Sequence, residues 1–301
     1  MSRIAYVNGR YLLHTHAAVH IEDRGYQFAD GVYEVFAVYN KKLIGQKGHL
    51  DRLKYSLNEL KINWSMSERA LMHIVHEVMR RNHIHNGLIY LQITRGVAPR
   101  DHSFPAQIPP ALVITGKKIK PVDKDILSRG VAVITIPDIR WKRRDIKSIS
   151  LLPNVLGKQE AKIADAYEAW MIDDDGFITE GTSTNAWIVD QKGNIITRTA
   201  SEKILNGITR LTVLEVSKSF GFKVLVRPFS LEEAINAREA FVTSSTSHVK
   251  AVTSINGKSV GNGHIGPVTQ KLLNDFLNFL DENRDSVIEH PTPEHSSQIS
   301  I

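Results

Sequence analysis

Alternating and helically spaced apolar residues predict most of the secondary structure of the N-terminal part. Residues 4–7 and 11–13 flank Asn8-Gly9, a dipeptide that favours a tight hairpin because both of its residues tolerate positive φ. Residues 31–39 alternate between two sets of side chains, and this period of two predicts a strand that ends at Asn40. The chain therefore opens with extended segments.

Two helices and two strands are expected next. Leucines three and four residues apart predict a helix over residues 49–62 with one buried stripe. Ser65 and Glu68 have the spacing of a capping box, which predicts the start of a helix that runs through Met79. Two strands follow, at 88–95 and 111–115, separated by the irregular loop 96–110.

The second half mixes short strands with helices. The expected strands are 131–136, 169–172, 177–180, 185–189, 195–197, 223–226 and 240–242. The expected helices are 155–167, 207–220, a short helix after the capping pair Ser230 and Glu233, and the amphipathic segment 266–281. We expect an α+β or α/β fold from this mixture.

A chain of 301 residues exceeds the length that one hydrophobic core usually serves, so two domains are expected. Residues 116–124 are polar, contain a proline and show no apolar period, which predicts a linker. This gives a small N-terminal domain at 1–115 and a larger domain at 125–282. Residues 283–301 are polar and proline-containing, and we expect a disordered tail.

Composition limits the classes of function. The net charge of +6 is spread along the chain and suits an anionic small molecule as readily as a polyanion. No long basic run with interleaved aromatics argues for nucleic acid. The chain has no cysteine, and no apolar run reaches the roughly 20 residues that cross a bilayer, so we expect a cytoplasmic protein. His73 and His76 lie three apart, but no third ligand completes a metal site.

One lysine could carry chemistry. Lys147 lies among apolar neighbours and follows the basic cluster 142–144. Apolar walls and nearby cations destabilise a charged amine, and a neutral amine is the nucleophile that Schiff-base formation needs. The local composition alone fits a solvent-exposed lysine at a strand end better, so the other parts of a site must come from elsewhere in the chain.

Three later motifs could supply those parts. Glu180 in T-E-G-T-S-T-N is a carboxylate that could pair with a protonated ring nitrogen. L-N-G-I-T-R, residues 205–210, opens a helix whose free N–H groups could bind phosphate. T-S-S-T-S, residues 243–247, offers hydroxyl groups to the same anion. Taken singly, the first motif fits a turn at Gly181 equally well, the second is also an ordinary helix start, and the third fits a solvated loop better.

Their order along the chain is similar to that of the fold-type IV pyridoxal-phosphate enzymes, the branched-chain and D-amino-acid aminotransferase family. The matching motifs are D-I-K-S, T-E-G-T-S-T-N, N-G-I-T-R and V-T-S-S-T-S, and the resemblance spans residues 4–281. It implies two domains, a small N-terminal α/β domain and a larger C-terminal domain with a β-barrel-like core. It also implies pyridoxal 5'-phosphate as the cofactor.

The resemblance assigns roles to single residues. Lys147 looks like the catalytic lysine that binds the cofactor covalently and then moves the substrate proton. Glu180 resembles the partner of the pyridine nitrogen, and Leu205 the side chain that packs on the ring. The phosphate would be bound by Arg52, Ile208, Thr209 and Ser245.

Two further motifs resemble the D-amino-acid aminotransferases. G-V-Y-E-V and P-R-D-H-S-F-P would place Tyr33, Arg100 and His102 on the substrate carboxylate, with Thr246 as a further substrate contact. In that subfamily the arginine and histidine come from the neighbouring subunit, which implies a homodimer. Asp101 departs from the small residue usual there, and we expect it to alter the loop geometry or the charge that the carboxylate meets.

The resulting hypothesis is transamination of D-amino acids of the D-alanine or D-glutamate type, with a 2-oxo acid such as 2-oxoglutarate or pyruvate as acceptor. Within the family, a branched-chain L-amino-acid aminotransferase and an aminodeoxychorismate lyase stay open as alternatives. A non-enzymatic basic binding protein is the alternative from another class, and such a protein would have no need of Lys147.

Overall fold

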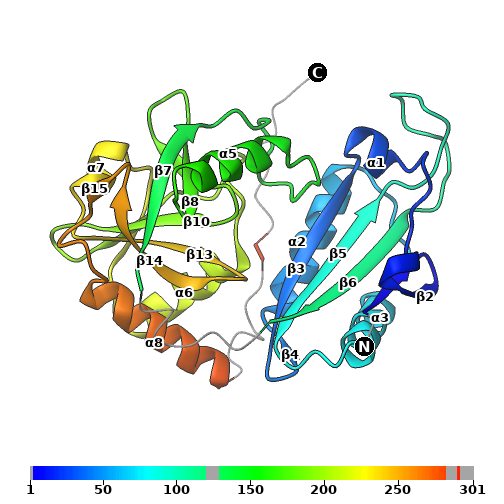
Figure 1. The fold of residues 1–301 in the computed structure, drawn as a ribbon, viewed down its shortest axis with the longest axis horizontal. Helices are drawn as coiled ribbons and strands as arrows, with labels where there is room; N and C mark the ends of the chain where they lie inside the picture. Colours follow the sequence, from blue (N-terminus) through cyan, green and yellow to red (C-terminus); the bar gives the residue numbers. More distant parts are fainter. Residues whose placement is uncertain (1–2, 120–128, 283–289, 292–301) are drawn as a thin grey trace.

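The computed structural model describes residues 3–119, 129–282 and 290–291, and its elements form two sheets with helices packed against them (Figure 1). The N-terminal sheet has the order β2-β1-β6-β5-β3-β4, with every neighbouring pair antiparallel. Its strands are β1 (Ile4–Val7), β2 (Arg10–Leu13), β3 (Gly31–Tyr39), β4 (Lys42–Leu43), β5 (Gly87–Thr94) and β6 (Ala111–Lys118).

The predicted hairpin and the second strand are confirmed. Asn8 and Gly9 have φ of 43° and 91°, as a tight turn between β1 and β2 requires. β3 spans the predicted residues, and its alternation separates two environments, with Glu34 and Phe36 buried and Tyr33 half-buried on the other face. The short helix α1 (Arg24–Phe28) was not predicted, because five residues are too few to show a period.

Helices α2 (Gln46–Glu59) and α3 (Glu68–Arg81) complete the N-terminal core. The predicted capping box is wrong, because Ser67 caps α3 and its hydroxyl accepts from the Ala70 N–H at 3.2 Å. α2 begins and ends three residues before the predicted helix, and Lys61 has a left-handed φ of 52° just after it. A left-handed residue cannot continue a right-handed helix.

The second sheet has nine strands in the order β12-β11-β10-β13-β14-β7-β8-β9, with β15 on β14. They are β7 (Val131–Pro137), β8 (Glu168–Ile172), β9 (Ile178–Gly181), β10 (Asn185–Val189), β11 (Ile195–Thr197), β12 (Val224–Val226), β13 (Glu239–Ser244), β14 (His248–Ile255) and β15 (Lys258–Ser259). β9 ends the order, yet only residues 182–184 separate it from β10. The sheet therefore curls back on itself, which agrees with the expected barrel-like core.

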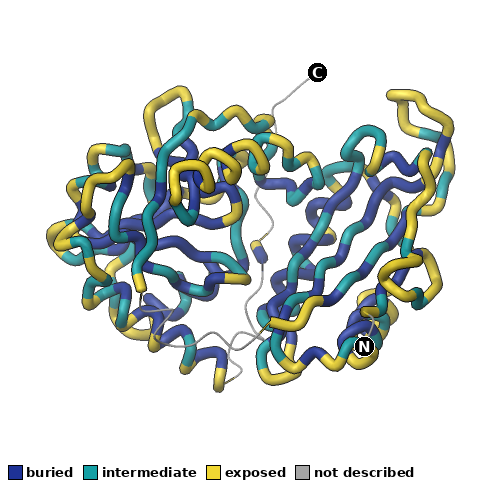
Figure 2. Tube along the Cα trace, in the orientation of Figure 1, coloured by how far each residue is buried: buried dark blue, intermediate teal, exposed yellow. Residues whose placement is uncertain are grey.

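β14 was missed by the sequence reading although it lies at the centre of this sheet, between β13 and β7. It follows the hydroxyl-rich residues 243–247, which are typical of a loop. Its first residue, His248, has a left-handed φ of 53°, so a sharp change of backbone direction precedes the strand. Figure 2 shows the buried strands of both sheets in dark blue.

Of the described helices, four cover the second sheet, namely α5 (Leu152–Ile163), α6 (Ile208–Ser219), α7 (Leu231–Ile235) and α8 (Pro267–Asp281). The capping box of α7 is confirmed, with Ser230 and Glu233 each bonded to the other's backbone. α5 was predicted at 155–167 but starts at Leu152, with a proline in its first turn, where the missing N–H costs nothing. It stops before Asp165, whose φ is 52°.

The division into two domains at 115 and 125 stays a prediction. β6 continues to Lys118, so the first residues of the predicted linker belong to a strand, whereas 120–128 lie outside the described residues. Most of the tail expected at 283–301 also lies outside them. His290 is described, and it is buried beside Tyr55 of α2, with 6.1 Å between the ring centres.

Candidate active site

Residues from both sheets line one cavity. It collects most of the predicted site residues, namely Tyr33, Arg52, Lys147, Glu180, Leu205, Ile208, Thr209, Ser245 and Thr246. Arg100 and His102 are not among the lining residues. Residues more than 200 positions apart in the chain are thus gathered as the motif order predicted.

The segment that carries Lys147 runs beside the first residues of β3 and pairs with them through an isolated bridge. The Tyr33 N–H donates to the Lys147 carbonyl at 3.0 Å, and Val32 pairs with Ser148 in antiparallel fashion. The Lys147 N–H donates to Ser56 Oγ of α2 at 3.2 Å. The backbone on both sides of the lysine is therefore fixed, and its amine lies 4.2 Å from the centre of the Tyr33 ring, on the cavity side.

The start of this segment is bonded to α2 by charged groups. Asp145 accepts from the Tyr55 hydroxyl at 2.5 Å and from Arg143 Nη2 at 2.8 Å, and Arg143 also contacts Glu59 at 2.5 Å. Burial, and then the Asp145 carboxylate, raise the pKa of Tyr55. Arg143 is therefore paired with acids, so its charge is largely balanced within the basic cluster 142–144 that precedes Lys147.

Glu180, the residue before the last of β9, lines the cavity and is held by four hydrogen bonds. Arg140 Nη1 donates to Oε1 at 2.5 Å, the Leu205 N–H reaches both oxygens at 3.1 and 3.2 Å, and Asn185 Nδ2 donates to Oε2 at 3.0 Å. Burial raises the pKa of Glu180, while Arg140 and the Leu205 N–H oppose that effect. The carboxylate is thus desolvated and oriented toward the cavity.

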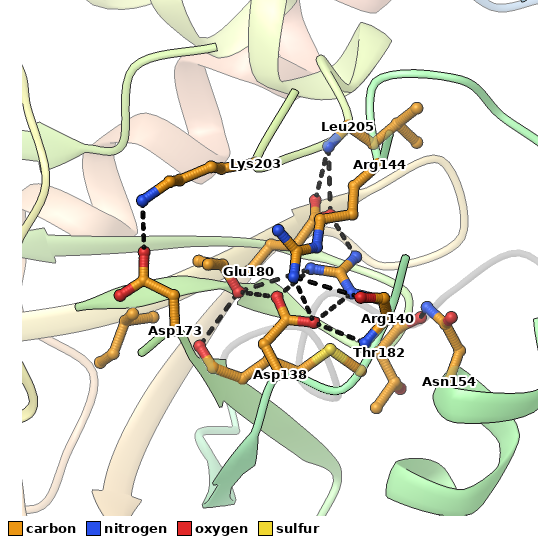
Figure 3. A network of polar contacts seen from close by, with 12 residues as sticks. Asp138, Arg140, Arg144, Asn154, Asp173, Glu180, Thr182, Lys203 and Leu205 are labelled. Carbon is orange, nitrogen blue, oxygen red and sulfur yellow. Dashed lines mark hydrogen bonds and ion pairs between the residues drawn. The ribbon is translucent and has the colours of Figure 1, made fainter. Parts of the chain in front are cut away.

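Arg140 lies between two acids, Glu180 and Asp138, as Figure 3 shows. Asp138 accepts from Arg140 Nη2 at 2.7 Å and from the Thr179 hydroxyl at 2.8 Å. Burial would raise the pKa of Asp138, but the contacts with Arg140 and Thr179 hold it below its usual value. Sequence reasoning missed both residues, although an acid and a base two apart directly after a strand are a signal for such a pair.

Arg52 is anchored from behind by a buried acid. Its Nε and Nη2 donate to the two oxygens of Glu34 at 2.8 Å each, and His49 Nδ1 lies 2.6 Å from the same carboxylate. Burial alone would raise the pKa of Glu34, but Arg52 and His49 lower it well below its usual range. The sequence did contain a sign of this cluster, because Glu34 lies on the apolar face of the predicted strand 31–39. A buried carboxylate needs charged or hydrogen-bonding partners.

A second group of lining residues, close to Arg52, offers donors suited to phosphate. α6 begins at Ile208 after Gly207, which has no side-chain cap, so the first N–H groups of the helix point outward toward the cavity. In the hydroxyl loop 243–247, Ser244 Oγ lies 2.7 Å from Ser247 Oγ and 3.0 Å from Thr246 Oγ1. These contacts fold the loop so that Ser245 lines the cavity.

A buried acid that the sequence reading missed orders the turn between β9 and β10. Glu168 accepts hydrogen bonds from the Thr182, Ser183 and Thr184 hydroxyl groups and from the Ser183 N–H. All three hydroxyl residues line the cavity. Hydrogen bonds to Glu168 therefore fix the hydroxyl residues of T-E-G-T-S-T-N in the cavity wall.

Arg100 and His102 lie on the exposed loop beside α1. The guanidinium of Arg100 lies 4.6 Å from the Phe28 ring, and the His102 ring lies 5.3 Å from it. Buried Arg24 donates to the Asp101 carbonyl at 2.6 Å and so fixes the loop. The Asp101 side chain accepts from the Ser103 N–H and hydroxyl at 2.8 and 2.7 Å, so it is occupied within the loop.

Comparisons with known proteins decide the family. A model described as Amino-transferase class IV matches residues 31–255. The chain belongs to the class IV aminotransferases. It is 43% identical to a D-alanine aminotransferase of Bacillus licheniformis, over 91% of this chain and 95% of the relative. It is 38% identical to one of Staphylococcus haemolyticus, over 93% and 99%.

The fold is that of the same family. A branched-chain amino acid aminotransferase from Escherichia coli superposes with a TM-score of 0.83, at 22% identity, over 100% of this chain and 99% of that one. At this identity the likeness concerns the fold alone. The fold-type IV architecture expected from the motifs is confirmed.

Class IV aminotransferases depend on pyridoxal 5'-phosphate, and the cavity of this chain fits that group. It offers an amine at Lys147, a carboxylate at Glu180 for a ring nitrogen, and helix N–H groups with Arg52 for a phosphate. Within the described part of the chain, no three His, Asp or Glu residues gather as a metal site, and no helix is long and apolar enough to cross a membrane.

Proposed function

We propose that this class IV aminotransferase transfers the amino group of D-amino acids of the D-alanine or D-glutamate type to a 2-oxo acid such as 2-oxoglutarate or pyruvate. The observation that carries the proposal is the identity of 35–43% with D-alanine aminotransferases over more than nine-tenths of the chain. The loop with Arg100 and His102 supports it, because a guanidinium and an imidazole are suitable donors for an α-carboxylate.

The bound cofactor would supply the electron sink that makes the Cα proton of an amino acid removable. Lys147 would hold the cofactor and afterwards accept and return that proton, since its backbone is fixed and its amine opens into the cavity. Glu180 would keep a proton on the ring nitrogen, and Arg140 and Leu205 orient its carboxylate for that task.

The phosphate would bind at Arg52 and at the start of α6. Arg52 would neutralise its charge, and the N–H groups of Ile208 and Thr209, with Ser245, would supply hydrogen bonds. Leu205, which lines the cavity beside Glu180, would pack on the ring. Tyr33 and Thr246 also line the cavity and would contact the substrate.

We further propose a homodimer in which each cavity receives Arg100 and His102 from the partner subunit. In one chain these residues lie outside the cavity, on an exposed loop. Apolar side chains are exposed near both regions: Trp141, Leu152 and Val155 near the cavity, and Ile21, Tyr26 and Phe104 near the loop. Exposed apolar patches of this kind are typical of subunit contacts. Cytoplasmic residence stays a prediction.

A paired assay tests the substrate class. D-Alanine, D-glutamate, L-alanine and L-leucine are offered with 2-oxoglutarate and with pyruvate, and we expect turnover with the D-amino acids. Preference for L-leucine would identify a branched-chain L-amino-acid aminotransferase instead. Pyruvate formed from aminodeoxychorismate would favour the lyase, and protein that stays colourless after addition of pyridoxal phosphate would contradict an enzyme of this class.

A further inference from the structure

Asn185, the first residue of β10, contacts three parts of the cavity wall with one buried amide. Its Nδ2 donates to Glu180 Oε2 at 3.0 Å and to the Leu205 carbonyl at 2.9 Å. Its Oδ1 lies 2.2 Å from the position that a Cβ on Gly207 would occupy. The amide therefore lies between Glu180 and Gly207, the residue directly before α6.

Each of these contacts needs an asparagine. Both atoms facing Nδ2 are acceptors, so the NH₂ group must point toward them, and an aspartate of the same shape would present an oxygen to two oxygens. The close approach of Oδ1 is possible because residue 207 has no side chain. Shape and hydrogen-bond polarity together specify this residue.

The backbone of Asn185 extends the connection to the hydroxyl loop. Asn185 pairs with Thr243 in the β10–β13 ladder, and Thr243 lies in β13 two residues before Ser245. The position of Asn185 is thus set by a central ladder of the sheet. Asn185 thus connects Glu180 to the start of α6 through its side chain, and to the hydroxyl loop through the backbone pairing of its strand.

We propose that Asn185 is a positioning residue that fixes the Glu180 carboxylate relative to the start of α6. A pyridine ring carrying a phosphate, held at its two ends by separate groups, then gains affinity from both contacts only while their spacing is constant. The proposal rests on the proposed function in assuming pyridoxal phosphate as the ligand. Asn185 acts through Glu180 and Gly207 and does not itself enter the chemistry.

The test compares Asn185→Ala and Asn185→Asp with the wild type and with Asn82→Ala. Asn82 is a matched control, since its amide makes three hydrogen bonds to the backbone at Ile4 and Val78, away from the cavity. For each apo protein the dissociation constants of pyridoxal phosphate and of inorganic phosphate are measured. The pH midpoint of the absorbance change of the bound cofactor is the third readout.

We expect pyridoxal phosphate to bind about tenfold more weakly to Asn185→Ala, and more weakly still to Asn185→Asp, because a donor to Glu180 is lost or reversed. Inorganic phosphate, which uses one end of the cavity, should change by less than about twofold. The absorbance midpoint should shift in both Asn185 variants and stay unchanged in Asn82→Ala.

Wild-type cofactor affinity and an unchanged midpoint in either folded Asn185 variant would overturn the proposal. Equal weakening of phosphate and pyridoxal phosphate would also overturn it, because the residue would then only support α6. Asn185→Asp has the shape of asparagine, so it carries the test should Asn185→Ala not fold. Wild-type protein that binds pyridoxal phosphate without turning over D-amino acids would contradict the proposed function. The binding comparison between wild type and the Asn185 variants would still test the role of Asn185.

Discussion

The amine of Lys147 lies over the ring of Tyr33, 4.2 Å from its centre. The backbones of the same two residues are also joined, because the Tyr33 N–H donates to the Lys147 carbonyl. We expect Lys147→Ala to lose turnover by about a thousandfold or more, because no other group can replace a covalent nucleophile. Unfolding midpoints should match the wild type. Lys142→Ala, an exposed lysine nearby, is the control, and wild-type turnover in Lys147→Ala would contradict the assigned role.

Replacing Arg100 should weaken substrate binding and leave the cofactor in place. We expect Arg100→Ala to raise the KM for the D-amino acid about 30-fold, because a charge-assisted hydrogen bond to the carboxylate is lost. The dissociation constant of pyridoxal phosphate should not change, since the loop lies outside the cavity of its own chain. Arg69→Ala, another exposed arginine, serves as control, and an unchanged KM in Arg100→Ala would disprove the prediction.

Mixing two damaged proteins tests whether Arg100 acts across the subunit boundary. Lys147→Ala and Arg100→Ala, each weakly active at low substrate concentration, are unfolded together and refolded as one sample. Half of the resulting dimers would be mixed, each with one intact site, so activity should return to about a quarter of the wild-type value. No recovery, in a sample shown to contain mixed dimers, would mean that Arg100 serves its own chain.

Glu180→Gln removes a negative charge while keeping most of the shape of the side chain. We expect kcat to fall about 100-fold, because a neutral amide cannot keep a proton on the ring nitrogen. Arg140 stays paired with Asp138, so the fold should persist. Glu160→Gln on exposed α5 is the matched control, and equal kcat values for the two variants would rule out the proposed role of Glu180.

Arg52 should have separable effects on folding and on cofactor binding. Arg52→Met leaves the Glu34 carboxylate buried without its main partner and should lower the free energy of unfolding by about 3 kcal/mol. Adding Glu34→Gln removes the buried charge and should restore most of that stability. Cofactor affinity should stay weak in the double variant, and its recovery would show that Arg52 acts only by supporting the fold.

Acid stability should depend on His248. Burial lowers the pKa of His248 from 6.5 to about 4, so unfolding takes up a proton between these pH values. Stability conferred by the neutral ring is therefore present above pH 6.5 and lost as the pH falls toward 4, by about 1–2 kcal/mol at pH 5. Asn also tolerates the left-handed φ of 53°, so His248→Asn should unfold in urea with a smaller loss between about pH 7 and 5. An identical loss in both proteins would contradict this.

Much of the fold was predictable where the pattern was local. β3 carried a clear alternation and was predicted to the residue, whereas β14 was missed because hydroxyl-rich residues precede it and its partners β7 and β13 are distant in sequence or separated by a turn. Ser65 was predicted as the helix cap, but Ser67 caps the helix, because spacing alone cannot tell which hydroxyl reaches an N–H. Capping depends on backbone geometry that the sequence does not state.

The site residues that stand in ordered motifs were predictable from the sequence. Lys147, Glu180 and Thr209 were found and do line one cavity. Glu168 was missed because it acts on residues that only the fold brings near and stands in no recognisable motif. Arg140 stands two residues after Asp138 at a strand end, but its contact with Glu180 depends on the fold. A buried charge must have a partner, so the existence of such partners could be inferred from the sequence. Which residues they are depends on tertiary contacts and could not be predicted.

Neighbouring residues on β3 serve opposite sides of the molecule, since Tyr33 faces the cavity and Glu34 holds Arg52 from within the core. Side chains on a strand alternate with a period of two, so adding or removing one residue between Gly31 and Tyr39 would exchange the two sets. The carboxylate would then enter the cavity and the phenol the interior. The evolutionary freedom of this strand thus lies in which side chains it carries and not in how many.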